Sequence, residues 1–145
     1  MQTLQSALAH LRDNGVTPVA VSRFYRTPAW PDPHDPEFVN AVAEVMTELS
    51  PSELIARLHE TERRFGRVRS TRNAPRTLDL DILDYAGRVE EGPPVLPHPR
   101  MAQRAFVLVP LRDVAPGWRH PVSGAAIAQM IAALPAADRE AIKPV

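Results

Sequence analysis

Apolar side chains recur at helical spacing in three stretches of the chain, which predicts three helices. The first covers residues 2–14, where leucines recur every three or four positions. The second begins with Ser50-Pro51-Ser52-Glu53, a capping box with proline at the first helical position, and runs to about residue 65. The third covers residues 124–134, with Ser123 as its expected cap.

Two further stretches predict β-strands. Residues 17–26 are rich in β-branched and aromatic side chains. Residues 37–49 fit both periods: apolar residues three and four apart match a helix, whereas alternate positions match a strand. We favour the strand, because only Thr47 breaks the alternation. We expect a proline-punctuated loop between the two strands and loose structure over the last ten residues.

The acidic segment, residues 78–83, has the alternation of a third strand. Apolar residues at positions 78, 80 and 82 flank Asp79 and Asp81, so both carboxylates lie on one face. A rise of about 3.3 Å per residue puts their Cα atoms about 6.6 Å apart. Two carboxylates at that distance can bind divalent cations. Two solvated aspartates on an outer sheet face are the alternative.

Arginines precede the acidic segment at unusual density. Residues 57–76 contain seven, and Arg67, Arg69, Arg72 and Arg76 come directly before the two aspartates. Guanidinium groups suit phosphate oxygens, and arginine with a metal is how proteins bind a polyphosphate. Ion pairing between these arginines and the aspartates is one alternative. Binding of nucleic-acid phosphates by the arginine cluster is another.

Two polar residues lie on predicted apolar faces, and one histidine lies in a rigid loop. Asn40 shares a strand face with Phe38, and Glu62 follows Leu58 on its helix. Each could hydrogen-bond a ligand. The alternatives are that Asn40 bonds neighbouring backbone and that Glu62 is partly exposed at the edge of the apolar helix face. His98 stands between two prolines, next to a short predicted helix that carries Arg100 and Arg104, and is suited to touching an anion.

Composition sets the broad class. The 145 residues are most simply one domain, residues 1–145. The absence of cysteine excludes disulfides and thiolate metal sites, and the net charge of +0 gives no general attraction to nucleic acid. No apolar run reaches the ~20 residues of a membrane span, and no signal segment is visible. We expect a cytoplasmic protein with no membrane partner.

Five motifs together resemble the family of 6-hydroxymethyl-7,8-dihydropterin pyrophosphokinases, over roughly residues 2–134. They stand in family order at near-family spacing. The central one is Arg72-Asn73-Ala74-Pro75-Arg76-Thr77-Leu78-Asp79-Leu80-Asp81-Ile82-Leu83. The others are Phe24-Tyr25-Arg26-Thr27-Pro28, Phe38-Val39-Asn40, Gly66-Arg67-Val68-Arg69 and the pair Pro97-His98-Pro99-Arg100 with Arg104-Ala105-Phe106-Val107-Leu108.

The resemblance implies an α+β fold with a ferredoxin-like antiparallel sheet, helices packed on it and mobile loops over the site. It implies an ATP-dependent diphosphotransferase of folate biosynthesis, 2-amino-4-hydroxy-6-hydroxymethyldihydropteridine diphosphokinase. Such an enzyme transfers the pyrophosphoryl group of ATP to the hydroxymethyl oxygen of the pterin and releases AMP. Partners are then the small molecules ATP and pterin, not nucleic acid, and the chain is a monomer or a weak dimer.

The resemblance also implies roles for individual residues. Metal ligands for two Mg²⁺ ions are Asp79 and Asp81. Catalytic contacts to the transferring group come from Arg67 and Arg76. ATP is bound by Glu62, Arg69, Arg72, His98 and Arg104. The pterin is bound by Thr27, Pro28, Phe38, Asn40 and Phe106, with the two phenylalanines stacked on its ring.

Two departures from the family pattern change the expectations. Asn73 and Ala74 stand where the family often has Trp-Gly, so an aromatic lid over the nucleotide is expected to be missing. Family members begin with an apolar strand ahead of the first helix, whereas this chain starts at that helix. We therefore expect the natural protein to carry about 20 further residues. A truncated or inactive relative that acts as a binding module is the alternative function.

Overall fold

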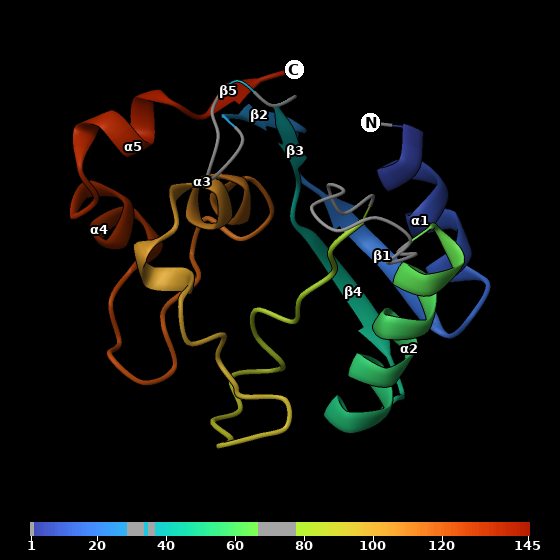
Figure 1. Cartoon of the computed structure of the whole chain (residues 1–145). Helices are drawn as coiled ribbons and strands as arrows, with labels where there is room; N and C mark the ends of the chain where they lie inside the picture. Colours follow the sequence, from blue (N-terminus) through green and yellow to red (C-terminus); the bar gives the residue numbers. More distant parts are fainter. Residues whose placement is uncertain (1, 29–33, 35–36, 67–77) are drawn as a thin grey trace.

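Strands separate the helices of this chain into two groups. The computed structural model describes residues 2–28, 34, 37–66 and 78–145. The elements are, in chain order, α1 (Gln2–Arg12), β1 (Val16–Val21), β2 (Tyr25–Thr27), β3 (Phe38–Asn40), β4 (Ala43–Thr47), α2 (Pro51–Arg64), η1 (Met101–Gln103), α3 (Ala105–Val114), α4 (Ile127–Ala132), α5 (Ala136–Glu140) and β5 (Lys143–Pro144). Helices α1 and α2 lie on one side of β1 and β4, and α3 to α5 lie on the other (Figure 1). The fold is therefore α+β, as expected.

Strands β1 to β4 form an antiparallel ribbon with one interruption. β1 pairs with β4, and β2 pairs with β3. At the interruption, the Ser22 N–H donates to the Val42 carbonyl at 2.8 Å, and the Ser22 Oγ accepts the Val42 N–H at 2.9 Å. The strand interpretation of residues 17–26 and 37–49 is thus confirmed, but each predicted strand is divided in two.

The end of the chain is more ordered than the sequence predicts. Helix α5 forms immediately after Pro135, and β5 pairs with β2. The Val145 N–H then donates to the Phe24 carbonyl at 2.9 Å. The expectation of loose structure over the last ten residues is wrong, because backbone hydrogen bonds to a neighbouring strand hold this segment.

Helix α2 begins as its sequence predicts. The Ser50 Oγ accepts the Glu53 N–H at 3.2 Å, and the Glu53 Oε1 accepts the Ser50 N–H at 2.9 Å. These reciprocal bonds satisfy two backbone donors at the helix start. The face that α2 buries carries Leu54 and Leu58, together with Glu62.

The helices after the acidic segment differ from the prediction. The third predicted helix is shortened to α4, which begins after Ala126 rather than at Ser123. The short helix expected to carry Arg100 and Arg104 is the 3₁₀ helix η1, which lies between these two residues and contains neither. Arg104 occupies the N-cap position of the longer helix α3 without a side-chain cap hydrogen bond. Helix α3 is not predicted by the sequence pattern, because it contains Pro110, a residue that disfavours helix interiors.

Most buried apolar side chains of the described residues belong to two clusters, one on each side of the ribbon. The larger cluster joins η1, α3 and α4 around Met101 and Leu108, which are both 0% exposed. The smaller cluster contains Leu11, Val16, Leu54 and Leu58, from α1, β1 and α2. The acidic segment packs against the smaller cluster through Leu80 and Ile82, so the apolar half of its alternation faces the interior.

Candidate active site

The acidic segment has the alternation of a strand but not its pairing. Leu78 is buried at 2% exposure, whereas Asp79 and Asp81 are exposed. Within the described part of the chain, no strand is formed over residues 78–83. The prediction of a regular strand is therefore wrong. The physical reason is that its backbone groups bond to a side chain and to a loop rather than to a neighbouring strand.

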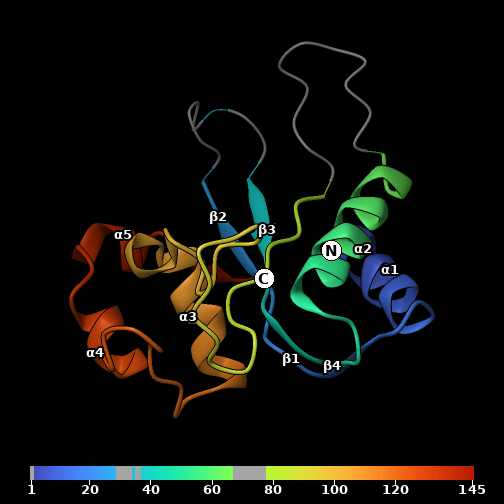
Figure 2. The same ribbon diagram turned by 90° about the horizontal axis from the view of Figure 1, so that it is seen from below.

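Two hydrogen bonds hold the acidic segment in place. The Leu80 N–H donates to the Glu62 Oε2 at 2.8 Å, which joins the segment to α2. The His98 N–H donates to the Leu83 carbonyl at 2.9 Å, which joins its end to the proline-rich loop. Figure 2 shows the start of the segment, in yellow-green, between β3 and α2. These contacts fix the backbone on which the two carboxylates are carried.

Glu62 is the only charged residue that is buried among the described residues, at 1% exposure. A buried carboxylate is costly unless hydrogen bonds replace its hydration. The Leu80 N–H supplies one such bond. The structure therefore gives Glu62 a role in holding the acidic segment, while its contact with a nucleoside stays a prediction.

His98 lies in the electric field of both aspartates. Burial lowers the pKa of His98 below its ordinary 6.5; Asp81 and Asp79 oppose this shift, while Arg104 and Arg100 add to it. The His98 Nδ1 accepts the Arg100 N–H at 3.2 Å, which implies that the neutral ring carries its proton on Nε2. The structure thus brings the predicted residues His98, Arg104, Asp79 and Asp81 into one neighbourhood.

Three of the predicted pterin-binding residues meet on the β2–β3 pair. Thr27 stands directly opposite Phe38, and Asn40 stands opposite Tyr25. The Asn40 Nδ2 donates to the Thr27 Oγ1 at 3.1 Å, so a side chain, rather than neighbouring backbone, is its partner. Thr27 is buried at 5% exposure, whereas Phe38 is 43% exposed. A polar pair beside an exposed aromatic ring is suited to a flat, polar heterocycle.

The second predicted aromatic residue lies on the neighbouring helix. Phe106 is in the first turn of α3 and is 36% exposed. The Arg104 guanidinium carbon lies 5.4 Å from the centre of its ring, within the range of a cation–π contact. Helix α3 packs against both β2 and β3. The two exposed phenylalanines therefore belong to elements in direct contact.

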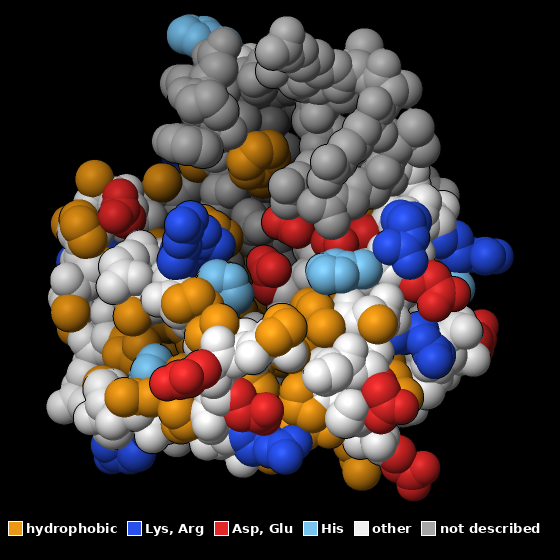
Figure 3. All heavy atoms as spheres, turned by 60° about the horizontal axis from the view of Figure 1, so that its bottom comes forward, with side chains coloured by type: hydrophobic (Ala, Val, Ile, Leu, Met, Phe, Trp, Pro, Cys, Tyr) orange, Lys and Arg blue, Asp and Glu red, His pale blue; other side chains and the backbone are white. Residues whose placement is uncertain are grey.

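Several predicted residues lack a structural test. Arg67, Arg69, Arg72 and Arg76 lie outside the described residues, as do Asn73 and Ala74. Pro28 is described and exposed, directly after β2. Figure 3 shows the face on which acidic, histidine and basic side chains gather close together.

The donor set fits Mg²⁺ only if a ligand completes its coordination. Among the described residues, no three His, Asp or Glu side chains form a metal-binding group. Mg²⁺ prefers oxygen ligands, and two exposed carboxylates are enough to bind it when substrate phosphates and water supply the other ligands. The residues present therefore fit a metal that arrives with a polyphosphate, not a metal held by protein alone.

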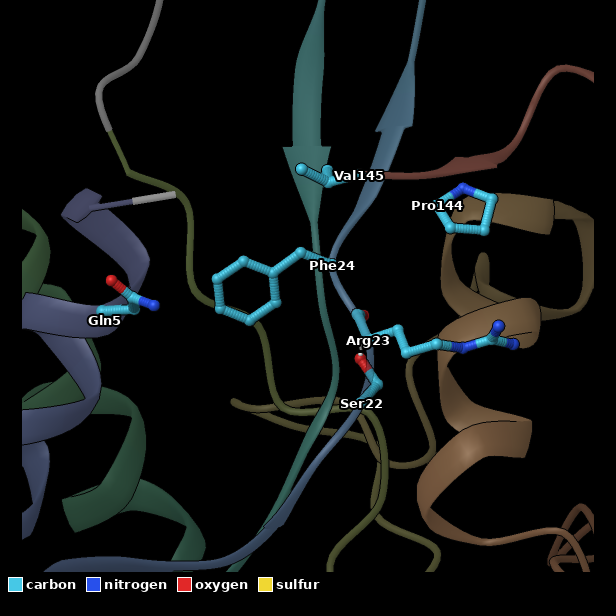
Figure 4. Close-up of a pocket in the computed structure, with 6 residues that line it drawn as sticks. All are labelled: Gln5, Ser22, Arg23, Phe24, Pro144 and Val145. Carbon is cyan, nitrogen blue, oxygen red and sulfur yellow. Dashed lines mark hydrogen bonds between the residues drawn. The ribbon is translucent and has the colours of Figure 1, made fainter.

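A pocket of about 310 Å³ lies away from these residues. It is lined by Gln5, Ser22, Arg23, Phe24, Pro144 and Val145 (Figure 4). None of these six is a predicted site residue. No helix in the described part of the chain is long and apolar enough to span a membrane.

Comparison with known proteins places the chain in a family. The family model for 7,8-dihydro-6-hydroxymethylpterin-pyrophosphokinase matches residues 1–116. Three relatives named 2-amino-4-hydroxy-6-hydroxymethyldihydropteridine pyrophosphokinase are similar. The protein of Synechocystis sp. is 41% identical over 133 residues, covering 90% of this chain and 68% of the relative. The protein of Methylorubrum extorquens is 44% identical over 115 residues, which cover 78% of this chain and 73% of the relative.

The third relative, from Pseudomonas aeruginosa, is 43% identical over 118 residues, which cover 81% of this chain and 72% of the relative. The matched range contains every predicted site residue, from Thr27 to Phe106. The chain belongs to the 7,8-dihydro-6-hydroxymethylpterin-pyrophosphokinase family.

Proposed function

We propose that this chain transfers the β,γ-pyrophosphoryl group of ATP to the hydroxymethyl oxygen of 6-hydroxymethyl-7,8-dihydropterin. The products are AMP and the pterin diphosphate, an intermediate of folate biosynthesis. The observation that carries this proposal is the family match over residues 1–116, which includes the exposed pair Asp79 and Asp81. The enzyme is an ATP-dependent diphosphokinase.

Asp79 and Asp81 would hold two Mg²⁺ ions on the triphosphate. When bound, these ions neutralise phosphate charge and orient the phosphoryl group for in-line attack. Leu78 and the Glu62–Leu80 hydrogen bond fix the backbone between the two carboxylates. Their exposure leaves their oxygens accessible to a ligand from solvent.

ATP and the transferring group would be bound by basic side chains. Neutral His98 can donate from Nε2 to a phosphate oxygen, and Arg104 lies nearby with a permanent positive charge. We propose that Arg69 and Arg72 bind ATP as well, with Glu62 near the nucleoside. Arg67 and Arg76 would contact the transferring group and offset the charge that develops on it.

The pterin would lie between the β2–β3 pair and the start of α3. Its ring would stack between Phe38 and Phe106, and Asn40 would bond its polar edge with Thr27 as support. Pro28 would add a contact beside Thr27. Because phosphoryl transfer through a loose transition state needs little activation of the attacking oxygen, positioning and charge neutralisation account for the rate.

The remaining properties follow the same proposal. Residues 1–145 form a single domain with a ferredoxin-like core, in a cytoplasmic protein that is a monomer or a weak dimer. Its partners are ATP and the pterin, not nucleic acid or membrane. The antiparallel ribbon with helices on both sides is compatible with this arrangement.

The proposal is tested by AMP formation from ATP and Mg²⁺, with and without the reduced pterin. We expect AMP only when the pterin is present. Asp79→Asn and Asp81→Asn should each lower the rate by about 100-fold or more, because each removes a ligand of the metal. Asp138→Asn makes the same change at an exposed position on α5 and should leave the rate unchanged. Absence of pterin-dependent AMP would refute the function.

Equal activity in wild type, Asp79→Asn and Asp81→Asn would leave the reaction standing but refute the metal assignment. Circular dichroism of each variant distinguishes loss of ligands from loss of fold. Both aspartates are exposed, so we expect wild-type spectra.

A further inference from the structure

A hydrogen-bonded cluster outside the predicted site joins strand β2 to helix α3. It consists of Arg23, Tyr25 and Asp113, and we refer to it as the Asp113 cluster. The Tyr25 hydroxyl donates to the Asp113 Oδ2 at 2.6 Å. The Arg23 N–H donates to the same oxygen at 3.3 Å, and the Arg23 Nη2 lies 3.3 Å from Oδ1. Figure 4 shows Arg23 reaching from the β1–β2 connection toward α3.

The position of Asp113 in its helix is unfavourable without these partners. Asp113 lies in the last turn of α3, where the helix dipole repels a negative charge. Burial raises the pKa of Asp113, but the hydrogen bonds from Tyr25 and Arg23 outweigh it and lower the pKa below 3.8 overall. The Asp113 carboxylate is therefore kept charged by Tyr25 of β2 and by Arg23 in the β1–β2 connection, not by its own helix.

The bond between Tyr25 and Asp113 is partly buried. Tyr25 is 2% exposed, and the Asp113 side chain is 17% exposed. The Arg23 side chain is 65% exposed, and such an ion pair contributes little. Within the Asp113 cluster, the charge-assisted hydrogen bond from Tyr25 therefore contributes more than the Arg23 ion pair.

The two elements joined here carry opposite sides of the proposed pterin site. On β2, Thr27 follows Tyr25 by two residues and accepts the hydrogen bond from Asn40. Phe38 lies opposite Thr27 on β3. On α3, Phe106 lies about 10 Å along the helix from Asp113, at a rise of about 1.5 Å per residue. A change in the angle of α3 at the cluster would thus move one aromatic ring relative to the other.

We propose that Tyr25 and Asp113 are positioning residues for the pterin: they set the spacing between Phe38 and Phe106 without touching the ligand. This inference rests on the proposed function. The proposal gives a functional role to two residues that are not among the predicted site residues.

The test is pterin affinity in Tyr25→Phe and Asp113→Asn. We measure the KM for the pterin at saturating ATP, and its Kd in the presence of a non-hydrolysable ATP analogue. Each variant should weaken pterin binding about fivefold or more, because a stacked ring loses its contact when misplaced by about 1 Å.

Tyr85→Phe is the matched control. It also removes a tyrosine hydroxyl that donates a hydrogen bond, in this case to the Leu49 carbonyl near α2. We expect loss of stability similar to that of Tyr25→Phe, measured by urea unfolding, with unchanged pterin affinity. Asp113→Glu keeps the charge and acceptor, so it should recover part of the affinity lost in Asp113→Asn.

The outcomes separate the two proposals. A wild-type chain that neither binds nor converts the pterin contradicts the proposed function and this inference with it. A wild-type chain that binds, with Tyr25→Phe and Asp113→Asn binding equally well, contradicts only the positioning role. Equal weakening by Tyr85→Phe also overturns that role, because it shows a general effect of lost stability.

Discussion

At the scale of single residues, three polar side chains among the described residues of the candidate site are held by identified hydrogen-bond partners. The Asn40 amide is held by Thr27, the Glu62 carboxylate by the Leu80 N–H, and the His98 ring by the Arg100 N–H. Side chains held in this way lose little freedom when a ligand binds, which favours binding. For Asp79 and Asp81, the hydrogen bond from the intervening Leu80 N–H to Glu62 holds the backbone that carries the two carboxylates.

Glu62 illustrates how far sequence reasoning reaches at this scale. Its place on an apolar helix face indicates that it needs a partner, and this is confirmed by 1% exposure. The identity of the partner was not predictable. Leu80 is eighteen residues away, and only the tertiary fold brings its N–H to α2.

Removal of the Glu62 carboxylate should destabilise the protein. We expect Glu62→Ala to lower the free energy of unfolding by about 1–3 kcal/mol, because it leaves the Leu80 N–H without its acceptor. Urea unfolding at neutral pH measures this change. Glu60→Ala, two residues earlier on the exposed side of α2, should change it by less than about 0.5 kcal/mol. Equal effects of the two substitutions would contradict the structural role of Glu62.

Asp113 should make the stability of the protein depend on acid pH. Since its folded pKa lies below 3.8, its charge stabilises the fold above that pH, and this contribution is lost as the pH falls through the folded value. Wild type should therefore lose stability more steeply than Asp113→Asn between about pH 4 and pH 2. Urea midpoints across this range provide the measurement, and parallel curves would refute the shift.

At the scale of elements, the sequence predicts structure well where the determinants are local. The capping box of α2 and the regularly spaced leucines of α1 involve residues within one or two helical turns, and both helices form where expected. The acidic segment shows the limit. Its alternation correctly predicts which side chains face the core, but strand pairing depends on distant neighbours, which periodicity does not reveal.

The same limit explains the elements that were missed. Helix α3 tolerates Pro110 because the surrounding cluster buries it, so tertiary packing overrides a local preference. Strand β5 has two residues, too few for any period, and forms because β2 offers an open edge.

The start of α2 provides a test of local determination. We expect Ser50→Ala to reduce the free energy of unfolding by about 1 kcal/mol, because the Glu53 N–H loses its acceptor. Ser52→Ala, an exposed position two residues later, should leave it unchanged or slightly higher. Thermal or urea unfolding distinguishes the two. A Ser52→Ala variant as unstable as Ser50→Ala would argue against a specific capping role.

At the scale of the whole molecule, two groups of helices meet across the ribbon, and the candidate site draws on both. The α2 side holds the acidic segment, and the α3 side supplies Arg104 and Phe106. His98, on the loop between them, bonds the end of the acidic segment. Both groups of helices therefore contribute residues to the proposed site.

The family was recognisable from the sequence because its motifs combine rare residue types at fixed spacing. Asp-x-Asp alone, or an arginine cluster alone, occurs on many surfaces. Together with the His98 loop and the Phe38 and Phe106 motifs they point to one chemistry, and the family match over residues 1–116 agrees. The Asp113 cluster was not predictable in this way, because its members are joined across 88 residues.

The most direct test of the central claim identifies the products of one reaction mixture that contains this chain, ATP, Mg²⁺ and the reduced pterin. Phosphorus NMR and mass spectrometry together count the phosphorus atoms on the pterin and name the nucleotide released. We expect equal amounts of AMP and a pterin that carries two phosphorus atoms. ADP with a pterin monophosphate, or no pterin-dependent consumption of ATP, would contradict the proposed pyrophosphoryl transfer.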